Sequence, residues 1–338
     1  MQIVGHTMDY EFSDLVKRLV QVGRISDADV LALRDAVWTD AEISIDMVDA
    51  LFMLNDRCAP TSPAWIDFFV EATEHVLLQQ TPPPGFLDTD GARWLQSRID
   101  REGRVASIGE IELLVSILEN AENAPDSLKT YALAQIEATI VSGVGPTRVG
   151  GSIRPNCIDE MEVHLLRRLI FASGGEGTVI VGAQEADMLF RIKDSVLRSG
   201  NAAGWLQLFV QGVANHLMAH SDYRPLSREE AIRLNAEMEI TTPSIAAFFN
   251  RMLPSEMLGR GTILDAFKAV FPREDDVFAK SPALDSRRLM TADEAAWLKT
   301  HIALDGETDP FEKALMTFII DEMGSLPASL ADLNRRRA

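Results

Sequence analysis

The chain carries the same helical segments twice, and this repeat constrains its fold more than any other feature. Residues 48–70 (segment A) resemble residues 186–210 (segment A′). The identical positions are Asp49/Asp187, Leu51/Leu189, Phe52/Phe190, Asp56/Asp194, Trp65/Trp205, Phe69/Phe209 and Val70/Val210. Because the shared residues include large aromatic side chains, the repeat predicts two similar packed cores.

A second pair of matched segments follows in the same order. Residues 94–103 (segment B) resemble residues 297–306 (segment B′). Their identical positions are Trp94/Trp297, Leu95/Leu298, Ile99/Ile302 and Gly103/Gly306. The segments therefore run A, B, A′, B′. The stretch between A′ and B′ is the longer one, which predicts an insertion at residues 221–286, where prolines are frequent.

A glycine-rich stretch, residues 143–155, lies between the two copies and predicts a linker. A phosphate-binding loop is the alternative, but the stretch lacks a GK[ST] ending and follows no buried strand. The predicted organisation is a first half at residues 10–142, the linker, and a second half at residues 156–325.

Helical periodicity dominates both halves and predicts an all-α fold of paired helix–loop–helix units. Apolar residues recur at steps of three and four, and strand-like alternation is confined to short runs such as residues 178–181. Helix starts are marked by capping boxes at residues 107–110, 291–294 and 309–312.

Composition narrows the classes of partner. The formal net charge of −19 repels nucleic-acid backbones and anionic membrane surfaces. No apolar run approaches the roughly 20 residues that span a bilayer. The first residues lack the basic start of a signal peptide, and the chain has only 2 cysteines. We expect a cytoplasmic protein that binds a protein partner or itself, with no nucleic acid and no membrane insertion.

The loops of the repeated segments resemble a degenerate EF-hand and the helix–loop–helix of TerB-like tellurite-resistance proteins. The shared pattern is an acidic residue and Gly in the loop, with Glu opening the next helix. Asp305, Gly306 and Glu312 fit it best, and Glu102, Gly103 and Glu110 fit it less well. The resemblance implies a helix–turn–helix element and, in the loop at residues 301–312, a cation site.

A count of oxygen ligands tests the implied calcium site. With Gly306 at the sixth loop position, Asp305, Asp309 and Glu312 supply oxygens, whereas His301 and Ala303 do not. The alternative role of Asp309 and Glu312 is a capping box that involves no cation. The expected cofactor is therefore none, with calcium at Asp305, Asp309 and Glu312 as the alternative.

Other chemical motifs are sparse. His216 and His220 lie four residues apart on a predicted helix, as paired metal ligands would, but no HExxH motif accompanies them. Histidines near a helix end also interact favourably with the helix dipole without a metal. No GxSxG motif occurs. The sequence favours a protein that is not an enzyme.

The predicted insertion contains a Met- and Phe-rich stretch, a composition that suits an adaptable protein-binding surface. Its candidate partner-binding residues are Phe248, Phe249, Met252, Leu253 and Met257. The alternative is that this stretch only pads the second half. The leading functional hypothesis is a non-enzymatic helical binding or scaffold protein, and the alternative is a calcium- or metal-responsive regulator that uses residues 301–312.

Overall fold

The computed structural model describes residues 3–38, 42–60, 63–148, 154–172, 181–218, 290–302 and 308–323. Most of these residues are helical, which confirms the predicted all-α class. The chain divides into two compact units, Met1–Pro155 with Ala172–Glu176, and Asn156–Phe171 with Gly177–Ala338. The described part of the predicted linker, residues 143–148 and 154–155, belongs to the first unit.

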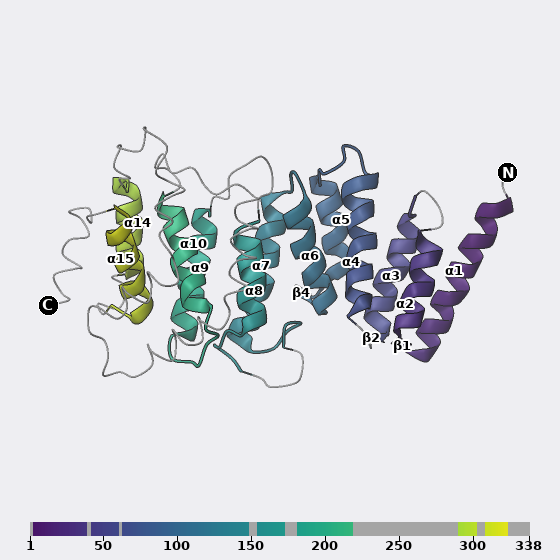
Figure 1. Ribbon diagram of the computed structural model, residues 1–338, viewed down its shortest axis with the longest axis horizontal. Coiled ribbons are helices and arrows are strands. Elements are labelled where there is room, and N and C mark those ends of the chain that lie inside the picture. Colours follow the sequence, from purple (N-terminus) through teal and green to yellow (C-terminus); the bar gives the residue numbers. More distant parts are fainter. Residues whose placement is uncertain are drawn as a thin grey trace, which may run out of the picture. The chain divides into compact units, whose positions relative to one another are not determined.

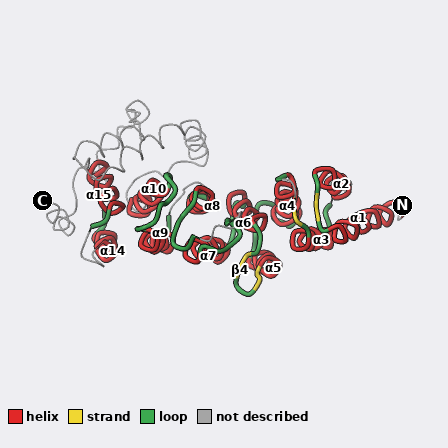
Figure 2. Tube along the Cα trace, turned by 90° about the horizontal axis from the view of Figure 1, so that it is seen from below, coloured by secondary structure: helices red, strands yellow, loops and turns green. Residues whose placement is uncertain are grey.

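The first unit is an array of helices in two layers. Its helices are α1 (Ile3–Val22), α2 (Asp27–Val37), α3 (Ile45–Arg57), α4 (Ala64–Glu74), the π-helix η1 (His75–Gln80), α5 (Thr89–Ile99), α6 (Ile108–Asn120) and α7 (Asp126–Ser142). Figure 2 shows α2, α4 and α6 in one row, with α1, α3 and α5 in the other. Helix α4 packs against both α2 and α6 and so forms the centre of its row.

The strands of the first unit are short connectors between helices. Strand β1 (Arg24–Ile25) pairs in parallel with β2 (Ala59–Pro60). Strand β3 (Asp100–Arg101) pairs in antiparallel fashion with β4 (Arg104–Val105). In this hairpin Glu102 and Gly103 have φ angles of 56° and 83°, as the two central residues of a type I′ turn require.

The second unit also consists of helices among its described residues. They are α8 (Glu160–Ile170), α9 (Ala183–Val196), α10 (Trp205–Met218), α14 (Ala292–Ile302) and α15 (Pro310–Met323). Helix α10 packs against α8, α9 and α15. Figure 1 labels these helices, and Figure 2 shows α8, α10 and α15 in one row and α9 and α14 in the other.

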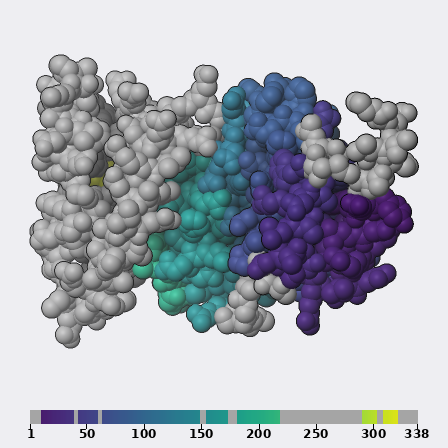
Figure 3. All heavy atoms as spheres, turned by 45° about the vertical axis from the view of Figure 1, so that its right-hand side comes forward, coloured from purple at the N-terminus to yellow at the C-terminus, as the bar shows by residue number. Residues whose placement is uncertain are grey.

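Aromatic side chains at matched positions fill both cores. Trp65 and Phe69 in the first unit and Trp205 and Phe209 in the second are all 0% exposed, as their spacing predicts. Edge-to-face pairs are also matched, since the ring centroids of Phe52–Phe69 lie 5.0 Å apart and those of Phe190–Phe209 lie 5.1 Å apart. The aromatic residues at these matched sequence positions therefore make similar contacts in the two units. The purple and blue atoms of Figure 3 show the close packing of the first unit's helices.

The predicted capping boxes that fall on described residues are confirmed. Ser107 and Glu110 cap α6 reciprocally, and the pairs Thr291/Glu294 and Asp309/Glu312 do the same for α14 and α15. Each box satisfies backbone N–H groups that the first helical turn leaves without a partner. Of the predicted strand at residues 178–181, only Val181 is described, and it lies outside any strand.

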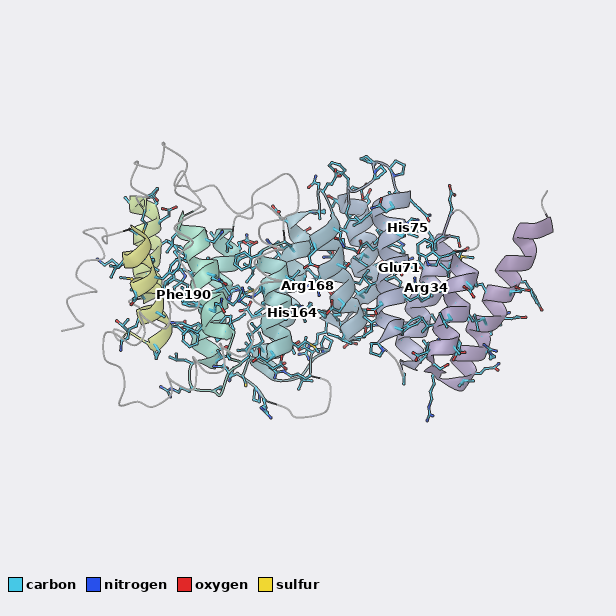
Figure 4. All side chains as sticks on the ribbon, viewed as in Figure 1. Arg34, Glu71, His75, His164, Arg168 and Phe190 are labelled. Atoms are coloured by element: carbon cyan, nitrogen blue, oxygen red, sulfur yellow. The ribbon has the colours of Figure 1, made fainter. Side chains whose placement is uncertain are left out.

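The structure adds a third matched pair that the sequence comparison missed. Helices α2 and α8 both begin with a capping box, Ser26/Asp29 and Asp159/Glu162. Figure 4 shows Arg34 beside Glu71, and the Arg34 Nη1 lies 2.7 Å from the Glu71 Oε2. In the second unit Arg167 Nη1 donates to Gln211 Oε1, also at 2.7 Å.

Candidate functional site

Several predicted site residues lie outside the described part of the chain. These are Phe248, Phe249, Met252, Leu253 and Met257 of the insertion, together with His220 and Asp305. The predicted insertion, residues 221–286, lies wholly outside the described residues. Residues 303–307 of the calcium-like loop also lie outside them. Asp309, Glu312 and His216 are described.

Asp309 and Glu312 converge on a buried lysine that sequence reasoning did not identify. Lys193 of α9 has a side chain only 2% exposed, and its Nζ lies 2.7 Å from the Asp309 Oδ2 and 2.7 Å from the Glu312 Oε1. Asp194 supplies a third carboxylate at 2.8 Å. A buried ammonium requires such partners, because an unpaired charge in the interior is costly. We name Lys193, Asp194, Asp309 and Glu312 the lysine cluster.

The remaining oxygens of the two loop carboxylates are also used. Asp309 Oδ1 accepts from the backbone N–H groups of Phe311 and Glu312, and Glu312 Oε2 accepts from the N–H of Asp309. Every carboxylate oxygen of Asp309 and Glu312 therefore has a protein partner. A calcium ion that used both residues would have to displace the Lys193 ammonium.

Electrostatics in the lysine cluster follow from burial and from the excess of negative charge. Burial acts to lower the pKa of Lys193, but hydrogen bonds to Asp194, Asp309 and Glu312 outweigh it, so the pKa is raised and the ammonium is retained. Burial raises the pKa of Glu312, and Asp309 adds to the rise, while Lys193 opposes it. The cluster is thus a fixed ion pair with one carboxylate that protonates more readily than an exposed glutamate.

In the first unit the residue at the position of Lys193 is uncharged. Asn55 occupies the place of Lys193, donates from Nδ2 to Ser107 Oγ at 2.8 Å, and accepts from Trp65 Nε1 at 3.2 Å. Ser107 corresponds to Asp309 as the residue that caps the next helix. Both units therefore link the end of one helix to the start of another, one through uncharged groups and the other through ions.

Two buried polar atoms, one in each unit, have no hydrogen-bond partner among the described residues. Trp205 Nε1 has no hydrogen-bond partner among the described residues, because a lysine ammonium cannot accept as Asn55 does. In the first unit Glu110 is 0% exposed, and its Oε1 has no partner within the described ranges. Burial raises the pKa of Glu110, although hydrogen bonds from the N–H groups of Ser107 and Ala106 to its other oxygen oppose the rise.

A second polar cluster joins α9 to α14 at the protein surface. Asp187 Oδ1 accepts from Trp297 Nε1 at 2.9 Å and lies 3.2 Å from His301 Nε2. The His301 ring centroid lies 4.4 Å from that of Trp297 and 4.7 Å from that of Phe190, the α9 residue labelled in Figure 4. We name Asp187, Phe190, Trp297 and His301 the histidine cluster.

An Asp–His pair suggests acid–base catalysis, but the ring nitrogens of His301 are both engaged. Nε2 faces Asp187, and Nδ1 lies 3.0 Å from the backbone oxygen of Trp297. A general base needs a free nitrogen lone pair within reach of a substrate proton. The cluster therefore acts as a contact between helices in this structure.

The first unit has a matched contact, with Arg98 in the place of His301. Arg98 binds Asp49 with two hydrogen bonds, Nε–Oδ1 at 2.9 Å and Nη2–Oδ2 at 3.1 Å. Its guanidinium carbon lies 4.5 Å from the centre of the Trp94 ring. Arg98 and His301 occupy matched positions in segments B and B′, and Asp49 and Asp187 are 41% exposed in both.

His216, predicted as a metal ligand, packs against the edge of the histidine cluster. Its ring centroid lies 4.9 Å from that of Trp297, and its Nδ1 lies 2.9 Å from the backbone oxygen of Val181. No group of His, Cys, Asp and Glu side chains with metal-binding geometry occurs in the described part of the chain. The pairing of His216 with His220 stays a prediction.

The loop of segment B uses its polar groups for the hairpin itself. Asp100 Oδ1 accepts from the N–H of Gly103 at 2.6 Å. Gln135 of α7 fixes the other side, since it accepts from Val105 N–H and donates to the Gly103 carbonyl. The arrangement accounts for Asp100 and Gly103 of this loop without a cation.

Comparisons with known proteins return nothing for this chain. No family model, no curated protein and no solved structure matches it. Among the described helices, none is long and apolar enough to cross a bilayer.

Proposed function

We propose that this chain is a non-enzymatic helical binding or scaffold protein, acting on a protein partner or on further copies of itself. The observation that carries the proposal is that the described polar clusters hold helices together. In each unit they link the helix of segment A or A′ to the helix of segment B or B′, or to the start of the next described helix, through direct hydrogen bonds. Groups that would otherwise serve chemistry hold the helical array together, which favours a role for its outer faces.

The predicted insertion distinguishes the second half and supplies the candidate binding residues of this proposal. Its composition, rich in Met and Phe between prolines, suits contact with varied apolar surfaces. Residues outside a repeated framework are free to acquire a specific partner, whereas the matched core positions are constrained by packing. We therefore assign partner binding to residues 221–286, with Phe248, Phe249, Met252, Leu253 and Met257 as contacts.

Deletion of residues 221–286 tests this proposal. We expect the full chain to recover a partner in an affinity capture, or to form an oligomer by light scattering, and the deletion variant to do neither. Circular dichroism serves as the control, because the described helices lie outside the deleted segment. A variant with alanine at Phe248, Phe249 and Met252 guards against a length effect. Unchanged recovery by both variants would overturn the assignment.

A calcium- or metal-responsive regulator is the second candidate. The observation in its favour is that Asp309 and Glu312 already converge on one cationic group, the Lys193 ammonium, with 2.7 Å contacts. Calcium would have to compete with this lysine, so the proposal requires a conformational change in the cluster. Calorimetric titration of the full chain decides it, since heat from calcium at micromolar to millimolar concentration supports a sensor and its absence rejects one.

A further inference from the structure

Helix α10 lacks the acidic residues that α4 carries at the matched sequence positions. The carboxylates of α4 are Asp67, Glu71 and Glu74. Two glutamines and an alanine stand at the matched positions of α10, whose sequence contains no Asp or Glu. The chain as a whole has 51 acidic residues and a formal net charge of −19. The core helix of the second unit is therefore an exception, and it packs against α8, which carries an arginine at the contact.

This arginine, Arg167, has no anionic partner within the described residues. Its Nη1 donates to Gln211 Oε1 at 2.7 Å, and no other hydrogen bond or ion pair joins it to the described part of the chain. A guanidinium has five N–H donors and no acceptor, so most of its hydrogen-bonding capacity is unused there. Because arginine only donates, Gln211 must present its oxygen to it, which leaves the Nε2 amide as a further donor.

The first unit shows which groups are missing. Arg34 Nη1 lies 2.7 Å from Glu71 Oε2, and the guanidinium carbon lies 5.5 Å from the centre of the Phe68 ring. In the second unit Gln211 stands at the position of Glu71, and Leu208 stands at that of Phe68. The second unit therefore keeps the cation but has replaced both the carboxylate and the aromatic ring that stabilise it.

The surroundings of Arg167 do not supply the missing charge. The side chain is partly buried, and burial lowers its pKa to about 10. The acidic residues at the start of α8 have other partners, since Glu162 forms a capping box with Asp159 and Glu160 accepts from the N–H of Ala203. A cation that is removed from water is costly without an anion nearby. A carboxylate from outside this pair of helices would therefore be bound favourably.

We propose that Arg167 and Gln211 form a binding site for the carboxylate of a small molecule. The guanidinium presents a planar set of donors that matches the two oxygens of a carboxylate, and Gln211 Nε2 adds another. Both side chains are partly buried where α8 packs against α10, so the site admits a small group. The ligand takes the place that Glu71 has in the first unit. The site does not depend on residues 221–286 or on the binding role proposed for them.

Thermal unfolding of the full chain tests the site with acetate as the probe. At neutral pH, circular dichroism compares sodium acetate with sodium chloride of equal ionic strength. We expect the melting temperature to be about 2–4 °C higher in saturating acetate, because a ligand of the folded state alone stabilises it. Equal melting temperatures in the two salts would overturn the proposal. A response to inorganic phosphate but not to acetate would overturn the assignment of a carboxylate.

Three variants locate the response. Gln211→Glu supplies the carboxylate within the chain, so it should raise the melting temperature in chloride and abolish the response to acetate. Arg167→Met should also abolish the response, and Gln211→Glu decides the matter if that variant does not fold. Arg168→Gln removes the same charge from the next residue of α8, labelled in Figure 4, and should keep the response. An acetate response that persists in Gln211→Glu, or is lost in Arg168→Gln, would contradict the site.

Discussion

The two units make a matched helix-to-helix contact, which is neutral in the first unit and ionic in the second. In the first unit Asn55 binds Ser107 and Trp65 through neutral groups, whereas in the second Lys193 binds Asp309 and Glu312 as ions. Both solutions hold the end of one helix to the cap of another. The difference teaches that residues at matched sequence positions can keep the place of a contact while they change its chemistry.

The same lesson applies to the other matched pairs. Arg98 and His301 both bind an aspartate, and Arg34 and Arg167 both bind a side chain on the next core helix. In the last pair Gln211 replaces the carboxylate, and burial lowers the pKa of Arg167 to about 10. Among the described residues the second unit therefore carries more buried charge, and its stability should depend more on pH.

The largest expected effect comes from removing the central lysine. Lys193→Met would leave the carboxylates of Asp309 and Glu312 facing one another in a buried site, at a cost of about 3–5 kcal/mol. Asn55→Met in the first unit is the matched control, and it should cost only about 1–3 kcal/mol because the stranded groups are neutral. Urea unfolding followed by circular dichroism measures both.

The pH dependence of this variant checks its cause. Burial raises the pKa of Glu312, so the folded state binds a proton more readily than the unfolded state does. Without Lys193 the loss of stability should shrink as pH falls toward the ordinary glutamate value of 4.5 and grow as pH rises. A loss that is independent of pH would indicate a packing defect instead.

A smaller effect, of opposite sign in the two units, is expected from glutamate to glutamine changes. Both oxygens of Glu312 accept hydrogen bonds, from Lys193 and from the Asp309 N–H, so Glu312→Gln replaces one acceptor with an NH2 group and should destabilise by about 1.5–3 kcal/mol. Glu110→Gln keeps an acceptor for the capping N–H groups but removes a buried charge whose Oε1 has no partner among the described residues. We expect it to stabilise the first unit by about 1 kcal/mol at neutral pH.

The stabilisation from Glu110→Gln should have its own pH signature. Burial raises the pKa of Glu110, so the wild-type cost is present when the carboxyl is ionised and is lost as pH falls. The advantage of glutamine should therefore disappear in acid, as paired urea titrations at both pH values would show. If both glutamine variants destabilise equally, the two units do not differ as the contacts indicate.

Local features of this fold were predictable, and distant pairings were not. The capping boxes at Ser107 and Asp309 and the buried ring of Trp65 follow from short spacings and helical periodicity. Lys193 contacts Asp309 and Glu312, which lie 116 and 119 residues further along the chain. A local sequence pattern does not predict contacts at such separations. The sequence did hold one signal, since Asp49 and Asp187 are identical in the repeat although neither is buried.

The smallest expected effect comes from the partly exposed ion pair of the first unit. Arg98→Gln would remove the guanidinium that binds Asp49 and lies over the Trp94 ring. Because the side chains of Arg98 and Asp49 are 31% and 41% exposed, we expect a loss of only about 0.5 kcal/mol, well below that of Lys193→Met. Urea unfolding followed by circular dichroism measures the loss, and Arg98→Lys, which keeps the charge but not the paired hydrogen bonds, is the control. A loss as large as that of Lys193→Met would show that burial does not separate the two contacts as the structure indicates.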